Sequence, residues 1–118
     1  MTMLRTRSSS EIRDASRREI VRTLVVDGTA TRTELATATG LSSATVSTLV
    51  TELREMGLVT DAGRDNAGTG RPTTVLRIEG RAGSLLGIDV AETYIRAVVF
   101  DAAVVEIGAA DVEVDEAW

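Results

Sequence analysis

The chain has 118 residues and contains no cysteine and no histidine. Without cysteine it can form no disulfide bond, and without either residue the usual zinc sites and histidine-based catalysis are excluded. We therefore expect no metal, no cofactor and no catalytic residue, and the sequence does not predict an enzyme. Aromatic residues are nearly absent: Tyr94, Phe100 and Trp118 are the only ones, so a core formed before Tyr94 must be aliphatic.

Long apolar runs are lacking as well. No segment approaches the length needed to cross a membrane, and the N-terminal MTMLRTRSSS lacks the apolar centre of a signal peptide. We expect a soluble, cytoplasmic protein with no membrane partner.

Lysine is also absent, and the net charge of −5 is unevenly distributed. Residues 1–81 carry 12 arginines and 10 acidic residues, whereas residues 82–118 carry one arginine and eight acidic residues. Because neutralisation of phosphates supplies much of the affinity for DNA, only the first part is a plausible DNA surface. Arginines are densest near the N-terminus, where we expect a flexible basic arm over residues 1–10.

The segment from Thr31 to Val59 predicts two helices joined by a tight turn. Thr31 and Glu34 have the spacing of a capping box, which starts a short helix at Arg32. Gly40 supplies the left-handed conformation that ends this helix.

A second helix is expected from Ser43 to about Met56, with Ser42 as its N-cap and Gly57 closing it. Its apolar residues recur at i, i+3, i+4 and i+7 and define one buried face: Val46, Leu49, Val50 and Leu53. Small residues occupy its leading turn and opposite face: Ser43, Ala44, Thr45, Ser47 and Thr48. Such a face lets a helix approach base edges in the major groove, although a helical bundle with Ser and Thr as caps is an alternative.

The loop AGRDNAGTGRPTT follows, between the β-prone runs 58–60 and 75–78, which together predict a hairpin. Arg64 and Arg71 lie in this loop, with Gly70 and Pro72 beside Arg71. A hairpin tip with arginines suits contact with phosphates or with a minor groove, and the alternative is a solvated loop with two charges. The helix pair and the hairpin predict a winged helix-turn-helix.

A further helix is expected from about Ser10 or Glu11 to Val26, with Ile12, Ile20, Leu24 and Val21 facing inward. It would complete a three-helix core and a DNA-binding domain over residues 11–81. The expected core residues are Ile20, Leu24, Leu35, Leu41, Val46, Leu49, Leu53, Leu58 and Ile78.

Residues 82–118 predict three strands, at 85–90, 94–100 and 104–114, joined by short turns as an antiparallel meander. Three strands with an uncovered apolar face are barely stable alone, so we expect this sheet to be an interface, for example with a second copy of the chain.

Three segments, LSSATVSTLVTELREMGLV, GTGRPTTVLRI and LLGIDVAETYIRAVVFD, resemble the N-terminal part of a ROK-family transcriptional regulator (repressor, open reading frame, kinase) over residues 15–115. The resemblance implies a winged helix ahead of the first strands of a sugar-kinase-like domain with an actin-like ATPase fold, and a sugar-responsive repressor. It also implies DNA contacts from the recognition helix and from a wing at Gly70, Arg71 and Pro72.

Kinase members of that family end their first strand in D-x-G-G-T, whose glycines let backbone amides approach ATP phosphates. Here Asp89 and Thr93 keep their places, but Ala91 and Glu92 replace both glycines. The resemblance therefore implies a regulator without kinase activity, and it places the sugar pocket, and so the effector site, beyond Trp118.

Together these observations predict a sequence-specific DNA-binding regulator of α+β class, a repressor of sugar-related genes that binds a palindromic operator as a homodimer. The expected DNA-binding residues are Ser42, Ser43, Thr45, Ser47, Thr48, Arg64, Gly70, Arg71 and Pro72. Two alternatives remain: a remnant of a ROK sugar kinase, and a winged helix that serves protein interaction.

Overall fold

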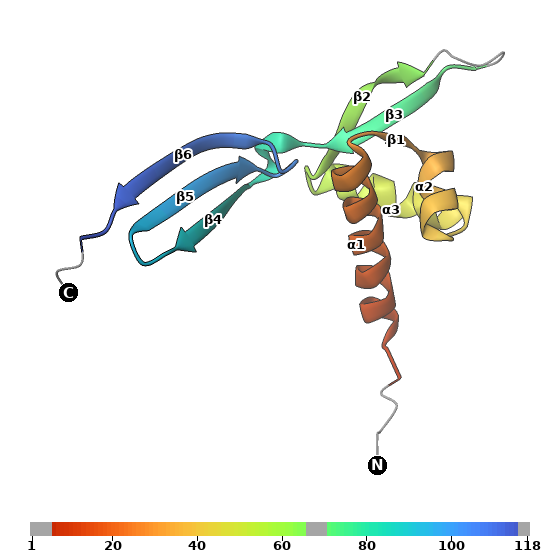
Figure 1. The fold of residues 1–118 in the computed structure, drawn as a ribbon. Helices are drawn as coiled ribbons and strands as arrows, with labels where there is room; N and C mark the ends of the chain where they lie inside the picture. The colour runs from red at the N-terminus through yellow and green to blue at the C-terminus, as the bar shows by residue number, and fades with distance from the viewer. Residues whose placement is uncertain (1–5, 66–70, 116–118) are drawn as a thin grey trace. The chain divides into compact units, whose positions relative to one another are not determined.

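The computed structural model describes residues 6–65 and 71–115. The chain divides into two compact units, residues 1–78 and residues 79–118. In the described residues, the first unit holds three helices and a three-stranded sheet, and the second holds a separate three-stranded sheet (Figure 1). The predicted α+β architecture, a winged helix-turn-helix followed by an antiparallel meander, is confirmed.

Helix α1 (Ser9–Asp27) begins slightly earlier than expected, because Ser8 caps it in a capping box with Glu11. Gly28 ends it with a φ of 83°. Ile20 and Leu24 are buried, but the prediction that Ile12 faces inward is wrong, since its residue is 55% exposed. The buried residues of α1 all lie in its C-terminal half, so Ile12 is beyond the reach of the core.

Helices α2 (Arg32–Thr39) and α3 (Ser43–Glu55) form the predicted pair. The Thr31 hydroxyl accepts a hydrogen bond from the amide of Glu34, and the Glu34 carboxylate accepts one from the amide of Thr31. Gly40 takes the left-handed conformation with a φ of 72°, which turns the chain between the two helices.

The sheet of the first unit has the order β1-β3-β2 and is antiparallel throughout. Strands β2 (Val59–Asp65) and β3 (Thr73–Ile78) form the predicted hairpin and are longer than the β-prone runs. A bulge between Asp61 and Gly63 interrupts their register, and Gly63 has a φ of 116° that favours glycine. Strand β1 (Ala30–Thr31), which pairs with β3, was not predicted.

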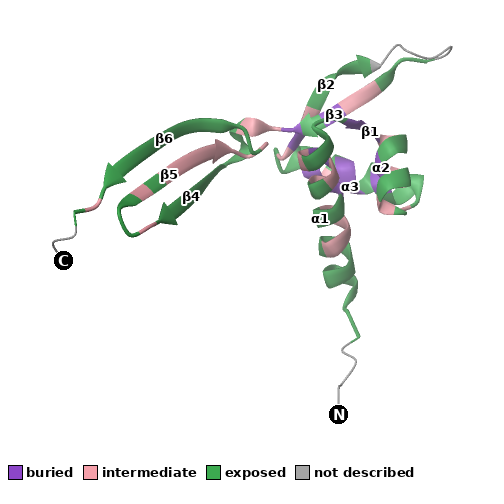
Figure 2. Ribbon diagram, in the orientation of Figure 1, coloured by how far each residue is buried: buried purple, intermediate pink, exposed green. Residues whose placement is uncertain are grey.

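The core of the first unit, where the ribbon is purple in Figure 2, is aliphatic, as predicted. Its buried apolar residues are Ile20, Leu24, Ala30, Leu35, Val46, Leu49, Val50, Leu53, Val59, Leu76 and Ile78. Leu41 and Leu58, which we expected there, are only half-buried because each lies in a connection at the edge of the core. Ala30, Val59 and Leu76 replace them, and each belongs to the sheet.

The second unit contains a short 3₁₀ helix, η1 (Gly80–Ala82), and strands β4 (Ser84–Val90), β5 (Tyr94–Asp101) and β6 (Glu106–Glu113) in the order β4-β5-β6. The third strand starts later than predicted. The Asp101 carboxylate accepts hydrogen bonds from the amides of Ala103 and Val105, at 2.9 and 3.0 Å. This turn holds Val104 at a φ of 62°, a left-handed conformation that cannot continue a strand.

The strand register separates two different faces of this second sheet. On one face, directly opposed residues form three rows without a polar side chain, Leu86–Val99–Gly108, Ile88–Ala97–Ala110 and Val90–Ile95–Val112. We call this the apolar face. The other face carries the charged row Asp89–Arg96–Asp111 beside the apolar row Gly87–Val98–Ala109.

Candidate nucleic-acid interface

Helix α3 has a buried face and an exposed face that differ completely in chemistry. The buried face consists of the four predicted apolar residues, none of them more than 2% exposed: Val46, Leu49, Val50 and Leu53. Ala44, Thr48 and Thr51 are exposed and follow one another at i, i+4 and i+7, on the side opposite the buried residues. We call these three residues the reading face.

Charge on α3 is confined to its C-terminal part. Ser43 to Thr51 include no charged residue, whereas Glu52, Arg54 and Glu55 follow directly. Because carboxylates repel phosphates, the N-terminal turns are the part of α3 that can enter a DNA groove. Thr51 belongs to this part and was missed by the sequence analysis, although its position seven residues after Ala44 could have identified it.

Hydroxyl groups at the start of α3 are bonded to the helix itself. The Ser42 hydroxyl accepts a hydrogen bond from the amide of Thr45 and lies 2.8 Å from the Thr45 hydroxyl. The hydroxyls of Thr48 and Thr51 donate to the carbonyl oxygens four residues earlier, at 3.0 and 2.9 Å. Ser42 is therefore the N-cap of α3, as predicted. Its contact with DNA stays a prediction.

An ion-pair network fixes α3 against α1. Both Arg13 and Arg17 pair with the carboxylate of Glu52, and Arg17 also pairs with Asp14 at 2.9 Å. The Glu52 side chain is 21% exposed and that of Arg17 is 28% exposed, so water screens the Arg17 pair only in part. Arg13 and Arg17 thus form ion pairs within the first unit, and these pairs help to hold α3 against α1.

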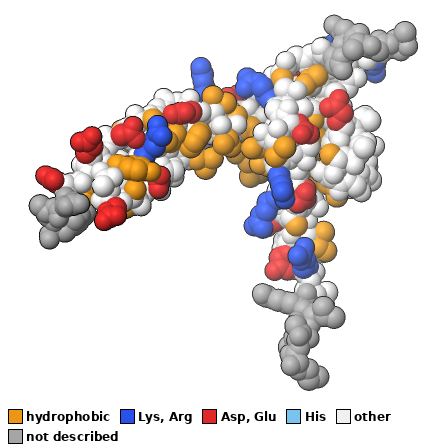
Figure 3. Space-filling view, viewed as in Figure 1, with side chains coloured by type: hydrophobic (Ala, Val, Ile, Leu, Met, Phe, Trp, Pro, Cys, Tyr) orange, Lys and Arg blue, Asp and Glu red, His pale blue; other side chains and the backbone are white. Residues whose placement is uncertain are grey.

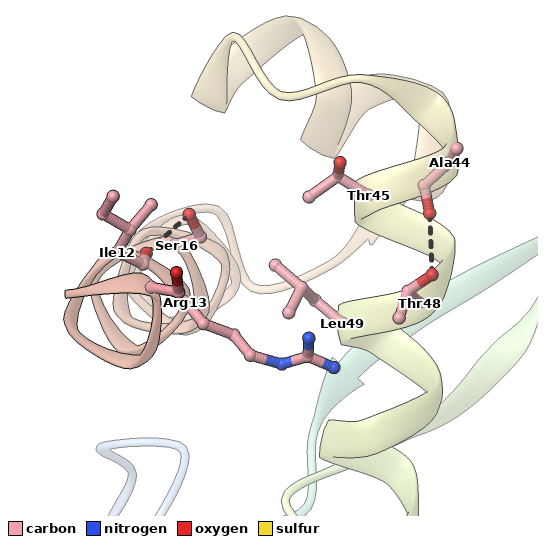
Figure 4. Close-up of a pocket in the computed structure, with 8 residues that line it drawn as sticks. Ile12, Arg13, Ser16, Ala44, Thr45, Thr48 and Leu49 are labelled. Carbon is pink, nitrogen blue, oxygen red and sulfur yellow. Dashed lines mark hydrogen bonds between the residues drawn. The ribbon is translucent and has the colours of Figure 1, made fainter.

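A cleft of about 360 Å³ lies between the N-terminal halves of α1 and α3. Ile12, Arg13 and Ser16 line it from α1, and Thr45 and Thr48 line it from α3 (Figure 4). The Arg13 side chain extends along the cleft toward α3. Thr45, a predicted DNA contact, therefore lies on the side of α3 that faces α1, next to the reading face.

The hairpin of β2 and β3 corresponds to the predicted wing. Arg64 lies on β2, and Arg71 and Pro72 lead into β3, all three exposed. Gly70 was also predicted as a wing residue and lies outside the described residues. Arg54 at the end of α3 pairs with Asp61 on β2, at 3.0 Å, so the base of the wing is tied to the recognition helix.

The turn between β4 and β5 is the place where the resemblance to the ROK family led us to compare this chain with kinase members. Here the turn between β4 and β5 holds Ala91, Glu92 and Thr93, and Glu92 is exposed. Next to it, the Tyr94 hydroxyl donates a 3.0 Å hydrogen bond to the Asp89 carboxylate. This bond and the charge of Asp89 raise the pKa of Tyr94 above its usual value.

Among residues 6–65 and 71–115, no group of acidic side chains is arranged to hold a metal ion. No helix in the same ranges is both long and apolar enough to cross a membrane.

Comparison with known proteins agrees with this geometry. Residues 13–60 match the family described as winged helix-turn-helix DNA-binding. The chain also matches a crystal structure of a ROK family transcriptional regulator, described as a homolog of the E.coli MLC protein, with a TM-score of 0.60 and 15% sequence identity. No curated protein sequence matches the chain significantly.

The structural match covers 87% of this chain and 26% of the other, so the chain spans about a quarter of the length of that regulator. At this identity the match demonstrates a common fold, which extends over both units. Residues 13–60 therefore belong to a winged helix-turn-helix domain of the DNA-binding type, in a chain that shares its fold with a ROK-family transcriptional regulator.

Proposed function

We propose that this chain is a sequence-specific DNA-binding transcriptional regulator that inserts α3 into the major groove. The observation that carries this proposal is the exposed face of α3, whose exposed residues between Ser43 and Thr51 are all small and uncharged, while the buried face fixes the helix on the core. A helix of this kind can approach base edges closely without repelling phosphates. The wing adds Arg64 and Arg71 as contacts to the backbone or to a minor groove.

The finer functional assignment follows from the resemblance over residues 15–115. The chain is a repressor of sugar-related genes, acts in the cytoplasm and has no enzymatic activity. In support, Glu92 stands in the turn where a kinase relative has a phosphate-binding glycine, and a carboxylate there repels phosphate.

The regulator binds a palindromic operator as a homodimer. One winged helix reads only a few base pairs, and two recognition helices placed one helical turn apart double the sequence that is read. The apolar face of the second sheet supports this assembly, because four of its aliphatic side chains are largely uncovered within the described chain: Leu86, Ile88, Val90 and Val112 are each at least 59% exposed.

The decisive experiment places a negative charge on the reading face. Thr48→Asp should reduce affinity for duplex DNA at least tenfold, because the new carboxylate faces phosphates, while circular dichroism remains unchanged. Thr93→Asp is the matched control, since it changes the net charge equally at an exposed threonine of the second unit. Equal affinities of both variants would exclude α3 as the reading element.

The wing is tested by salt dependence. Arg71→Ala should weaken binding and lower the slope of log affinity against log salt concentration by about one, as expected for one lost phosphate contact. An unchanged slope would mean that Arg71 does not contact a phosphate.

A further inference from the structure

The reading part of α3 lacks every side chain that usually identifies a base by two hydrogen bonds. From Ser43 to Thr51 there is no arginine, lysine, asparagine, glutamine, aspartate or glutamate. Guanine and adenine are commonly recognised by such paired hydrogen bonds, whereas thymine is distinguished in the major groove by its 5-methyl group. The available chemistry on α3 is therefore hydroxyl and methyl.

The hydrogen bonds within α3 restrict the donor role of two of these hydroxyls. The Thr48 hydroxyl donates to the carbonyl oxygen of Ala44, and the Thr51 hydroxyl donates to that of Ser47 (Figure 4 shows the first bond). Both hydroxyl hydrogens are thus used within the helix, and each bond limits rotation about χ1. The γ-methyl groups of Thr48 and Thr51 take part in no such bond and are available for apolar contact.

The third member of the reading face is itself a methyl group. Ala44 precedes Thr48 by one helical turn, and Thr51 follows by about another, so three methyl groups line the exposed face. Apolar contact with the thymine methyl is a known use of alanine and of the threonine methyl at a DNA interface.

We propose that α3 reads thymine through its 5-methyl group, using Ala44, Thr48 and Thr51. This inference rests on the proposed DNA binding and names the feature of the operator that α3 recognises. It predicts that each half-site of the operator has thymines whose methyl groups face α3 in the major groove.

The test uses duplexes selected by the chain itself from a random pool. In the selected duplex each thymine is replaced in turn by deoxyuridine, which keeps the base pair and removes only the methyl group. Loss of one buried methyl contact should weaken binding about fourfold. Positions read by the wing in the minor groove should be insensitive, because the methyl group lies in the major groove.

A pair of double variants identifies the residues responsible. Thr48→Ser with Thr51→Ser keeps both hydroxyls and removes both methyl groups, so it should lose most of the preference for thymine over deoxyuridine. Thr48→Val with Thr51→Val keeps methyl groups and removes the hydroxyls, so it should retain the preference.

The outcomes separate the inference from the proposed function. If the unaltered chain binds duplexes with a steep salt dependence but tolerates deoxyuridine at every position, thymine reading is wrong and DNA binding stands. Loss of the preference in the valine variant would assign readout to the hydroxyls and overturn the inference. Absence of salt-dependent binding to any duplex would overturn the proposed function itself.

Discussion

Tyr94 is the only tyrosine of the chain, so its ionisation can be followed without interference. Its pKa is raised chiefly because its hydroxyl donates to Asp89, and the negative charge of Asp89 adds to the effect. Asp89→Asn should therefore lower this pKa toward the usual value of about 10, measured by tyrosinate absorbance. Any stability from the bond is present below the unfolded pKa and is lost as pH rises through the raised folded pKa.

Glu113→Gln provides the control for this prediction. Glu113 lies opposite Tyr94 in the β5–β6 ladder, and no hydrogen bond joins their side chains in the described structure. Glu113 is not among the charges that shift the pKa of Tyr94, so removing its charge should leave this pKa nearly unchanged. Equal decreases in both variants would mean that charge alone, and not the hydrogen bond, sets this pKa.

Local chemistry explains why single residues of the helix-turn-helix could be predicted from the sequence. Thr31, Glu34 and Gly40 act on amides and carbonyls within four residues, so their spacing alone determines where α2 begins and ends. Ile12 and Val104 could not be placed in this way. The exposure of Ile12 depends on how far the core extends along α1, and the conformation of Val104 depends on the Asp101 carboxylate.

At the scale of the elements, the sequence predicts the helices but not how they are held together. Strand β1 has only two residues, Ala30 and Thr31, and exists because it pairs with β3 more than 40 positions away in the chain. The join between α1 and α3 depends on Glu52 and on arginines 35 and 39 residues earlier. Such contacts leave no periodic pattern, whereas the buried stripe of α3 does.

Glu52→Gln tests this join. The variant removes the charge that binds Arg13 and Arg17. It should lower the free energy of unfolding of the helical unit by about 1 kcal/mol. This value is near the upper end of the contributions of exposed ion pairs, because the network is partly buried. The measurement is thermal or urea unfolding followed by helical circular dichroism, since the described helices of α type all lie in the first unit.

Glu55→Gln is the matched control on the same helix. Glu55 is exposed and forms no ion pair within residues 6–65 and 71–115, so its effect should stay below about 0.5 kcal/mol. The difference between the two variants should shrink at about 1 M salt, where the Debye length falls to about 3 Å. Equal effects of both substitutions at low salt would show that the network does not stabilise the domain.

At the scale of the whole molecule, the two units differ in what they leave exposed. Among the described large apolar residues of the first unit, only Ile12, Val26 and Met56 are exposed. The second unit exposes aliphatic side chains along β4, along β6 and in the turn before β6, and orange surface lies over this sheet in Figure 3. The sequence predicts these strands, but it does not show which residues share a face. Only the register, with its irregularity between Val99 and Phe100, separates the apolar face from the charged one.

Burial of the apolar face by a second copy would join two recognition helices into one DNA-binding unit. We therefore expect the whole chain to be a dimer by light scattering, and a chain ending at Gly80 to be a monomer with an intact helical fold. The shorter chain retains all the buried residues of the first unit, so loss of the dimer would not reflect unfolding. If both chains are monomers, the second sheet is not the dimer interface.

Two substitutions on β4 test which face of the sheet is buried between copies. Ile88→Asp puts a carboxylate at the centre of the apolar face and should yield monomers, because a buried unpaired charge is costly. Leu85→Asp makes the same chemical change on the same strand but on the opposite face, so the dimer should persist. A dimer lost equally in both variants would point to pairing along the edge of β4 instead of packing through the apolar face. The Ile88→Asp variant should also bind a palindromic duplex more weakly than the unaltered chain does. As a monomer it must fill the two half-sites in two separate binding events.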